Sequence, residues 1–377
     1  MVILTALMLF GCVPINKDSG LMVRAEASSL HTPTVKNMLA NAFLPVGKAV
    51  YVYGGAWNEE DTAAGVEAMS YGVSQRWAEF YQAQSSAYNY QNTRYQIHDG
   101  LDCTGYVGWT MYQLFGDRYS ENGYVYQSKK MASSYASLFG GTYVPKEQVT
   151  NRVCGDVMSS GGHAYMVVGE CSDGSVVFLH ASPPAVNLCG TATPSGRTNS
   201  EAVKLATHYM KTYFPAHYGK FPDTSRGKSY LTDYNRMHWP ELVLPDPDGY
   251  RSMSAEAILA DLFENVKIYA NGTRLFSDAE PYIDEGTTYV PLRAVSESFG
   301  ADVAWNNETG TATVQGEGHT VKINVRKNTV AFDDDPDGRM FQMQNDRITV
   351  PIRLAAELCG FCVEWEGVSK SVYLTKE

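Results

Sequence analysis

Residues 101–115 read LDCTGYVGWTMYQLF, a pattern that predicts a buried helix at the centre of the first part of the chain. Asp102 follows a turn-like Asp-Gly pair at positions 99–100 and suits the N-cap position of a helix. Apolar residues then recur close to the helical period, at Val107, Trp109, Met111, Leu114 and Phe115. Cys103 is therefore expected on the first turn of this helix.

Cys103, at a helix N-terminus, is a candidate nucleophile. Free backbone N–H groups and the positive end of the helix dipole stabilise a thiolate, so we expect the pKa of this thiol to be lowered. A thiolate in that position can form covalent acyl intermediates. The alternative is a half-buried structural cysteine that only packs.

Two histidines further along the chain are candidates for the partners of this thiol. Segments 161–169 and 175–182 are rich in β-branched and aromatic residues and are separated by the turn 172–174, which predicts a hairpin. The hairpin sets His163 near the start of one strand and His180 near the end of the next. His163 can then take the thiol proton, while His180 bonds the far ring nitrogen and fixes the tautomer. The structural alternatives are a solvent-facing strand end for His163 and a satisfied core histidine for His180.

Several short motifs resemble those of the NlpC (p-sixty) family of papain-like bacterial cell-wall hydrolases. They are Tyr51-Val52-Tyr53-Gly54-Gly55, Asp102-Cys103-Thr104-Gly105, Gly155-Asp156-Val157, Gly162-His163 and Leu179-His180-Ala181. The resemblance implies a helix bearing the cysteine, packed on an antiparallel sheet. It also implies Cys103 as nucleophile, His163 as base and His180 as third polar residue. Tyr51 and Asp102 would line the pocket that binds the free amino end of a peptide stem.

Two features depart from the NlpC pattern. Thr104 stands where the family usually has Ser, which is a mild change. Residues 56–100 separate the aromatic-Gly-Gly motif from the nucleophile, where the family has far fewer. This insertion is rich in aromatic residues and could roof the cleft, so it bears on the substrate specificity that the resemblance implies more than on catalysis.

The composition is that of an ordinary globular protein of two or three domains, with 377 residues, 44% hydrophobic and 19% charged. A net charge of −11 argues against nucleic acid as a partner. Seven cysteines do not make a disulfide framework for a chain of this size. Cys359 and Cys362 have C-x-x-C spacing without a second pair, so we expect no zinc site, and no cofactor motif occurs.

The beginning of the chain predicts export. Residues 1–13 form an apolar run too short to span a bilayer, typical of the core of a secretory signal. Cys12 lies in a stretch that resembles a lipoprotein cleavage box, which would anchor the protein to the membrane through a lipid. The rival is cleavage after Ala27, and the structural alternative is a buried strand. We therefore expect residues 1–27 to be a signal and the mature protein to be secreted or held at the cell envelope.

An internal repeat marks the end of the chain. Residues 289–305 align with residues 349–365, with Pro, Arg, Glu, Gly and Trp recurring 60 positions apart. Each copy predicts a Pro at a helix start, a two-turn helix, a Gly stop and a strand that carries Trp. Arg293 with Glu297, and Arg353 with Glu357, have the spacing of ion pairs on one helix face.

This repeat region, residues 265–377, resembles the copper amine oxidase N-terminal-like (stalk) domain of secreted bacterial proteins. The motif that carries the resemblance is Val290-Pro291-Leu292-Arg293 with Gly300 and Trp305. The resemblance covers the non-catalytic stalk, so copper is not implied. Residues 246–264, rich in Pro, Gly and Asp at their start, are expected to be a linker.

These observations together predict an α+β protein: a papain-like NlpC-type domain at 33–245 and a small α+β domain with an internal repeat. By the resemblance to the NlpC family, the expected function is that of a secreted cysteine peptidase that hydrolyses peptidoglycan stem peptides at the D-glutamyl–diamino acid bond. Alternatives are a papain-like amidase or acyltransferase, or an inactive cell-wall-binding protein. We expect peptidoglycan as the partner, no nucleic acid, no metal, and a monomer.

Overall fold

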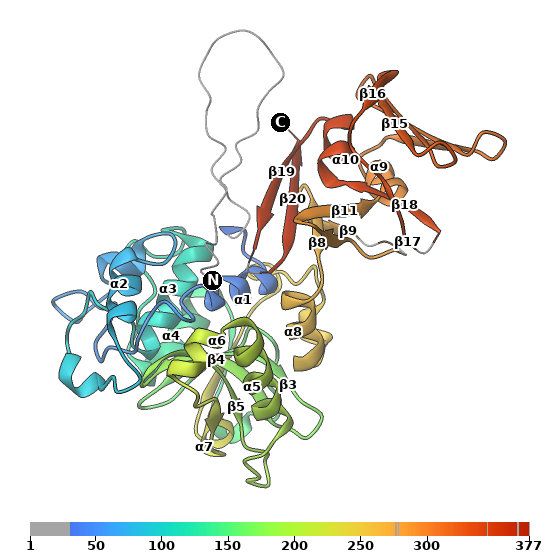
Figure 1. Ribbon diagram of the computed structural model, residues 1–377. Helices are drawn as coiled ribbons and strands as arrows, with labels where there is room; N and C mark the ends of the chain where they lie inside the picture. The colour runs from blue at the N-terminus through green and yellow to red at the C-terminus, as the bar shows by residue number, and fades with distance from the viewer. Residues whose placement is uncertain (1–30, 276, 278, 345, 368, 377) are drawn as a thin grey trace. The chain divides into compact units, whose positions relative to one another are not determined.

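A computed structural model describes residues 31–275, 277, 279–344, 346–367 and 369–376 (Figure 1). The chain divides between Phe263 and Glu264 into two compact units. Helices take 30% and strands 28% of the described residues, which confirms the α+β class. The expected signal at 1–27, with Cys12, lies outside the described residues. Among the residues described, no helix has both the length and the apolar character that crossing a membrane requires.

The first unit is built on a seven-stranded sheet with the order β1-β7-β2-β3-β4-β5-β6. Its neighbours pair antiparallel, except for the parallel pair β5–β6 at one edge. The strands are β1 (Thr142–Val144), β2 (Val157–Ser159), β3 (Ala164–Glu170), β4 (Val176–Ser182), β5 (Ala185–Thr191), β6 (Ser225–Arg226) and β7 (Asn235–His238).

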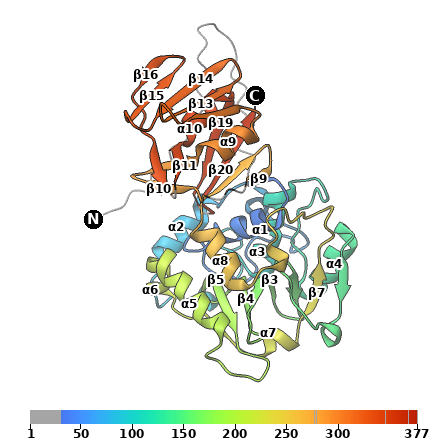
Figure 2. The same ribbon diagram turned by 90° about the vertical axis from the view of Figure 1, so that its right-hand side faces the viewer.

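Helices cover this sheet. α3 packs on β3 and β4, α4 on β2 and β7, and α5 on β4 and β5. Figure 2 shows α5 and α8 over the strands from another side. The helices are α1 (Val35–Phe43), α2 (Gln75–Ala83), α3 (Cys103–Phe115), α4 (Ser128–Phe139), α5 (Glu201–Tyr213), α6 (Pro215–Lys220), α7 (Ser229–Thr232) and α8 (Ala255–Phe263), with short 3₁₀ turns η2 (Val66–Met69), η3 (Tyr90–Thr93), η4 (Lys146–Gln148) and η5 (Tyr250–Ser252).

The central helix α3 confirms the prediction made for residues 101–115. Asp102 is its N-cap, and the carboxylate accepts a hydrogen bond from the backbone N–H of Gly105 at 2.7 Å. Every residue of α3 is buried, because α1, the sheet and the insertion cover it on different sides. Gly116 ends the helix with φ +48°, a conformation that favours glycine.

The insertion at 56–100 is tied to α3 rather than projecting from the unit. Gln113 of α3 donates through Nε2 to the carbonyl of Ser70 at 3.0 Å and accepts from the N–H of Gly72 at 2.7 Å. Trp77 of α2 is fully buried and its ring lies 6.0 Å from that of Trp109. Polar bonds and aromatic packing therefore fix the insertion against the helix that carries Cys103.

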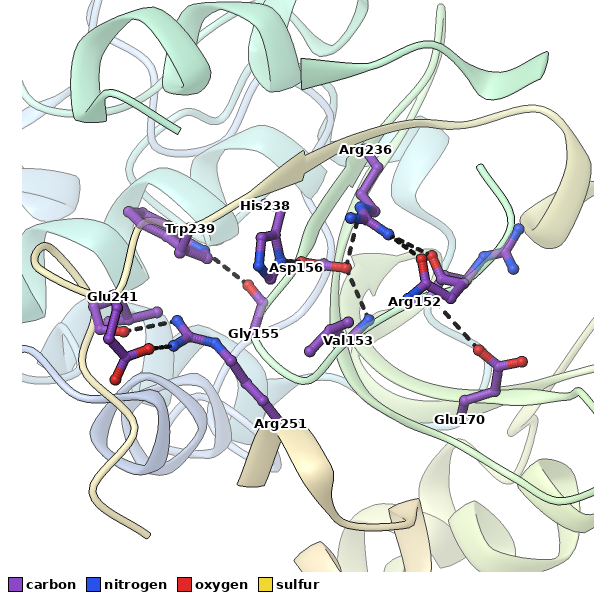
Figure 3. Close-up of polar contacts among 12 residues, drawn as sticks. Arg152, Val153, Gly155, Asp156, Glu170, Arg236, His238, Trp239, Glu241 and Arg251 are labelled. Atoms are coloured by element: carbon purple, nitrogen blue, oxygen red, sulfur yellow. Dashed lines mark hydrogen bonds and ion pairs between the residues drawn. The ribbon is translucent and has the colours of Figure 1, made fainter. Parts of the chain in front are cut away.

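Asp156, from the Gly155-Asp156-Val157 motif, joins two strands of the sheet from within (Figure 3). Its carboxylate is fully buried and accepts a hydrogen bond from the N–H of Val153 at 2.8 Å. It pairs with His238 at 2.7 Å and with Arg236 at 3.5 Å, both on β7. The motif thus fixes β2 against β7, which places the adjacent β3 and its histidine.

Residues 246–264, expected to be a linker, are largely folded onto the first unit. Tyr250 donates to the buried Asp261 at 2.7 Å, and Phe263 lies edge-on to Phe43 of α1 with centroids 4.8 Å apart. α8 packs on β3, where Gly169 allows the backbone of Ala255 to approach closely. The apolar residues of α8 were sufficient to bury one face, and the local Pro/Gly composition did not reveal this.

The second unit contains three small sheets of mainly antiparallel strands. Their orders are β10-β11-β18-β17, β12-β13-β14-β15-β16 and β19-β20-β8-β9, where β20–β8 is a parallel pair. The strands are β8 (Lys267–Ala270), β9 (Thr273–Leu275), β10 (Tyr282–Asp284), β11 (Thr287–Pro291), β12 (Asp302–Asn306), β13 (Thr311–Gly316), β14 (His319–Asn324), β15 (Thr329–Phe332), β16 (Asp335–Asp337), β17 (Gln342–Gln344), β18 (Arg347–Pro351), β19 (Phe361–Glu366) and β20 (Ser371–Lys376).

The internal repeat is visible as two strand–helix units that meet at the centre of this second unit. β11 leads into α9 (Leu292–Ser298) and β18 into α10 (Ile352–Leu358). β11 and β18 pair antiparallel with Val290 opposite Val350, so equivalent residues of the two copies face each other. The expected Arg293–Glu297 ion pair is present at 3.1 Å between two exposed side chains of α9, and Glu357 of α10 pairs with Arg339 at 2.5 Å.

We expect Asp156→Ala to destabilise the protein by about 3 kcal/mol. The substitution removes the buried carboxylate and leaves Arg236 and His238 without this partner. Glu241→Ala is the matched control, since Glu241 is an exposed carboxylate of the same unit that pairs with Arg251. The control should change the free energy of unfolding by less than about 1 kcal/mol. Urea unfolding followed by circular dichroism measures both, and equal effects would contradict a structural role for Asp156.

Candidate active site

Cys103 lies on the first turn of α3, beside the start of β3. The sulfur is close enough to be stabilised as a thiolate by the backbone N–H groups of Ala164, Thr104 and Cys103 itself. Ala164 follows His163 directly in the chain, so the fold brings the nucleophile candidate and the base candidate to the same place. The Cys103 residue is 7% exposed.

The expectation of a lowered thiol pKa is wrong for this protein. Burial raises the pKa of Cys103 well above its ordinary value, and the negative charge of Asp102 raises it further. The N–H groups act in the predicted direction, but the loss of solvation of a thiolate outweighs them. The resting sulfur at neutral pH is therefore a thiol.

Asp102 is fully engaged within the protein. One carboxylate oxygen accepts from the Thr104 hydroxyl at 2.9 Å and from the Gly105 N–H, and the other accepts from Trp57 Nε1 at 2.9 Å. Burial raises the pKa of Asp102 to about 6, although these hydrogen bonds lower it. Asp102 thus fixes the position of Cys103, and its expected contact with a substrate amine remains a prediction.

The two histidines form a hydrogen-bonded pair. Nε2 of His163 lies 2.8 Å from Nδ1 of His180, and the rings meet edge to face. This is the bond to the far ring nitrogen that the hairpin predicted. Burial and the positive charge of Arg226 lower the pKa of His163 to about 3. The same causes, with burial the larger, lower the pKa of His180. Both rings are neutral at pH 7.

This bond decides which nitrogen of His163 can receive a proton. Since Nε2 is used by His180, Nδ1 is the nitrogen of His163 that is left to accept a proton. A neutral imidazole has one donor and one acceptor nitrogen, so a base at Nδ1 must carry its proton on Nε2. In that tautomer, Nε2–H of His163 donates a hydrogen bond to Nδ1 of His180.

Arg226, Tyr230 and Tyr234 surround the pair and were not identified from the sequence. The ring of Tyr230 lies 5.6 Å from that of His163 and 5.8 Å from that of His180. Tyr234 is 6.3 Å from His163, and the pKa of Tyr234 is raised mainly by burial and partly by the nearby Cys103. No local pattern signals these residues, because β6 and α7 approach the site only in the folded sheet.

Tyr51 is placed next to Cys103 by the aromatic-Gly-Gly motif. Burial, Cys103 and Asp102 raise the pKa of its phenol, in that order. Its ring meets the ring of Tyr90 edge-on at 5.4 Å, and its carbonyl accepts from the Tyr88 hydroxyl at 2.8 Å. The insertion therefore contacts both residues expected to bind substrate: Tyr51 through Tyr88 and Tyr90, and Asp102 through Trp57.

The insertion also carries an open hollow of about 450 Å³, lined in part by Gly54, Tyr95 and His98. Cys103 and His163 do not line it, so the hollow and the cysteine–histidine set are distinct features. Within the described ranges, no group of three or more His, Cys, Asp or Glu side chains is arranged to hold a metal ion.

Comparison with known proteins bears on the second unit. Residues 269–374 match the family model of the copper amine oxidase N-terminal domain, which confirms the resemblance drawn from the repeat. No curated protein and no solved structure matches the chain. The family match does not reach the first unit, so the resemblance of residues 33–245 to the NlpC family stays a prediction.

We expect the alkylation rate of Cys103 by iodoacetamide to keep rising above pH 8.5, about the pKa of a free cysteine, because burial and Asp102 disfavour the thiolate. Asp102→Asn removes the neighbouring charge and should shift the rate profile to lower pH. Peptide mass spectrometry separates Cys103 from the other cysteines. A plateau already reached below pH 7 would indicate a thiolate–imidazolium ion pair and contradict the prediction.

We also expect stability to fall as the pH drops from 6.5 toward 3. His163 has a folded pKa of about 3, so the unfolded chain takes up the proton first and is favoured by acid. His163→Gln should reduce this dependence, whereas replacement of the exposed His208 should not. Urea unfolding at a series of pH values measures the slope, and an unchanged slope in His163→Gln would contradict a half-buried neutral imidazole at this position.

Proposed function

We propose that this protein is a cysteine peptidase of the bacterial cell envelope that hydrolyses peptidoglycan stem peptides. The observation that supports it most is the hydrogen-bonded pair His163–His180 beside Cys103 at the N-terminus of α3. A thiol, a base and a residue that orients the base are what nucleophilic acyl transfer requires.

The proposed reaction starts from neutral groups. The Cys103 sulfur attacks the peptide carbonyl while its proton passes to Nδ1 of His163. Backbone N–H groups at the start of α3 stabilise the negative oxygen of the tetrahedral intermediate. The C–N bond then breaks, and the amine leaves with the proton from His163. Water adds to the thioester, with His163 as base, and releases the acid and the free thiol.

The low basicity of His163 affects two steps of this reaction: removal of the thiol proton and protonation of the leaving amine. A pKa of about 3 makes the imidazole a weak base, so the thiol proton moves only as the sulfur attacks. The imidazolium that forms is a strong acid, which favours prompt protonation of the leaving amine. His180 holds the ring in one orientation through both transfers.

The substrate is proposed from the resemblance to the NlpC family. Tyr51 and Asp102 would bind the free amino end of the stem, and the bond cut would join D-glutamate to the diamino acid. Trp57, Tyr88 and Tyr90 contact these residues from the insertion and support a modified specificity. The second unit would act as a non-catalytic stalk, with the protein secreted or anchored at the envelope as a monomer.

Purified muropeptides incubated with the full chain, followed by mass spectrometry of the fragments, test this function. We expect wild-type protein to cleave at the proposed bond and Cys103→Ala or His163→Gln to lose at least about 100-fold in rate, as loss of a general base does. Cys171→Ala, another buried cysteine of the same unit, should stay within about twofold of wild type.

The outcomes separate the alternatives. Transfer of the acyl group to an added amine, in place of water, would identify an acyltransferase. Release of the stem from the glycan strand would identify an amidase. Cleavage that survives in Cys103→Ala would overturn the proposed nucleophile, and wall binding without cleavage would leave an inactive wall-binding protein.

A further inference from the structure

Asn187 lies beside the histidine pair on the next strand of the sheet. β3, β4 and β5 are neighbours in that order, and His180 on β4 is the register partner of Asn187 on β5. Directly opposed residues of an antiparallel pair point to the same face, with Cβ atoms about 4.5–5.5 Å apart. His180 is fully buried and Asn187 is 4% exposed, so bulk water does not separate them.

Each of these two side chains makes one hydrogen bond and has one buried atom that lacks a partner among the described residues. His180 Nδ1 is bonded to His163, and Asn187 Nδ2 donates to the carbonyl of Asp223 at 3.2 Å. In the part of the chain that the structure describes, neither His180 Nε2 nor Asn187 Oδ1 has a hydrogen-bond partner. Buried polar atoms are seldom left unpaired, so a donor and an acceptor on opposed residues are candidate partners for each other.

The tautomer of the pair depends on an acceptor at this place. For His163 to accept the thiol proton at Nδ1, its own proton must be on Nε2 and bonded to His180 Nδ1. His180 then carries its proton on Nε2. Without an acceptor for that proton, the tautomer that carries it on His180 Nδ1 has the lower free energy. His163 would then carry its proton on Nδ1 and could not act as the base.

Three further side chains near His180, among the residues that the structure describes, form no hydrogen bond with its Nε2: Arg226, Phe178 and Tyr230. The guanidinium of Arg226 is a donor and repels a proton added to either ring. Phe178 and Tyr230 contact the His180 ring with their own rings, at 5.0 and 5.8 Å between centroids. The bond to Asp223 orients the amide of Asn187, which makes Oδ1 the acceptor.

We propose that Asn187 is a positioning residue of this site: its Oδ1 accepts the hydrogen bond of His180 Nε2–H, directly or through one bridging water, and so keeps His163 in the tautomer that can act on Cys103. This inference rests on the proposed function for its catalytic consequence. The tautomers of the two histidines, on which the inference depends, can be measured without a substrate.

Two matched substitutions isolate the acceptor. Asn187→Leu and Asn187→Asp both lose the donor bond to Asp223, but only Asp keeps an oxygen at Oδ1. We expect Asn187→Leu to lower kcat about 10- to 100-fold, by analogy with the loss when a residue that orients a metal-ligating histidine is replaced, with KM unchanged. Asn187→Asp should stay within a few-fold of wild type. Thr191→Val, on the same strand and equally buried, controls for loss of stability and should leave kcat unchanged.

The substrate-independent measurements use nitrogen NMR of histidine-labelled full-length protein and the alkylation rate of Cys103. We expect wild-type His180 to carry its proton on Nε2, and Asn187→Leu to shift it toward Nδ1 and slow the alkylation of Cys103. Assignment comes from His163→Gln and His180→Gln. A proton on Nδ1 of His180 in the wild type, or a folded Asn187→Leu protein with unchanged tautomer and alkylation, would overturn the proposal.

These results distinguish the two proposals. If wild-type protein cleaves no muropeptide but Asn187→Leu still changes the tautomer, the proposed function fails and the role of Asn187 stands. If muropeptides are cleaved equally by both proteins, the role of Asn187 fails and the peptidase function stands.

Discussion

The carboxylate of Asp102 is the constraint on which the site depends. It caps α3 through the N–H of Gly105, and it binds Trp57 from the insertion with its second oxygen. One buried group therefore fixes where the helix begins and holds the insertion against it. The position of Cys103 follows directly, because it is the next residue in the chain.

The same carboxylate works against the reactivity that a helix N-terminus usually confers. Its charge and the burial of the sulfur raise the pKa of Cys103, while three backbone N–H groups act to lower it. The balance favours a neutral thiol next to a neutral imidazole. A site of this kind differs from a preformed ion pair: in the proposed reaction the proton must move during the attack, and the orientation of His163 becomes decisive.

Orientation is supplied by the sheet. Asp156 joins β2 to β7, β2 pairs with β3, which begins directly after His163, and His180 on β4 is the register partner of Asn187 on β5. Changes in the core of the sheet therefore act on the geometry of the two histidine rings. The second unit contributes a separate repeat-based fold and matches the copper amine oxidase N-terminal domain family.

The sequence by itself determined the elements with local signals: the capped helix at Cys103, the hairpin that carries His163 and His180, and the repeated strand–helix units of residues 289–305 and 349–365. Caps, turns and hydrophobic periods act over a few residues, so one chain is enough to read them. The tertiary structure alone decided the protonation of Cys103 and the folding of residues 246–263 onto the first unit. It also brought Arg226, Tyr230, Tyr234 and Asn187 to the histidine pair. These outcomes depend on burial and on contacts between residues far apart in the chain, which no local pattern records.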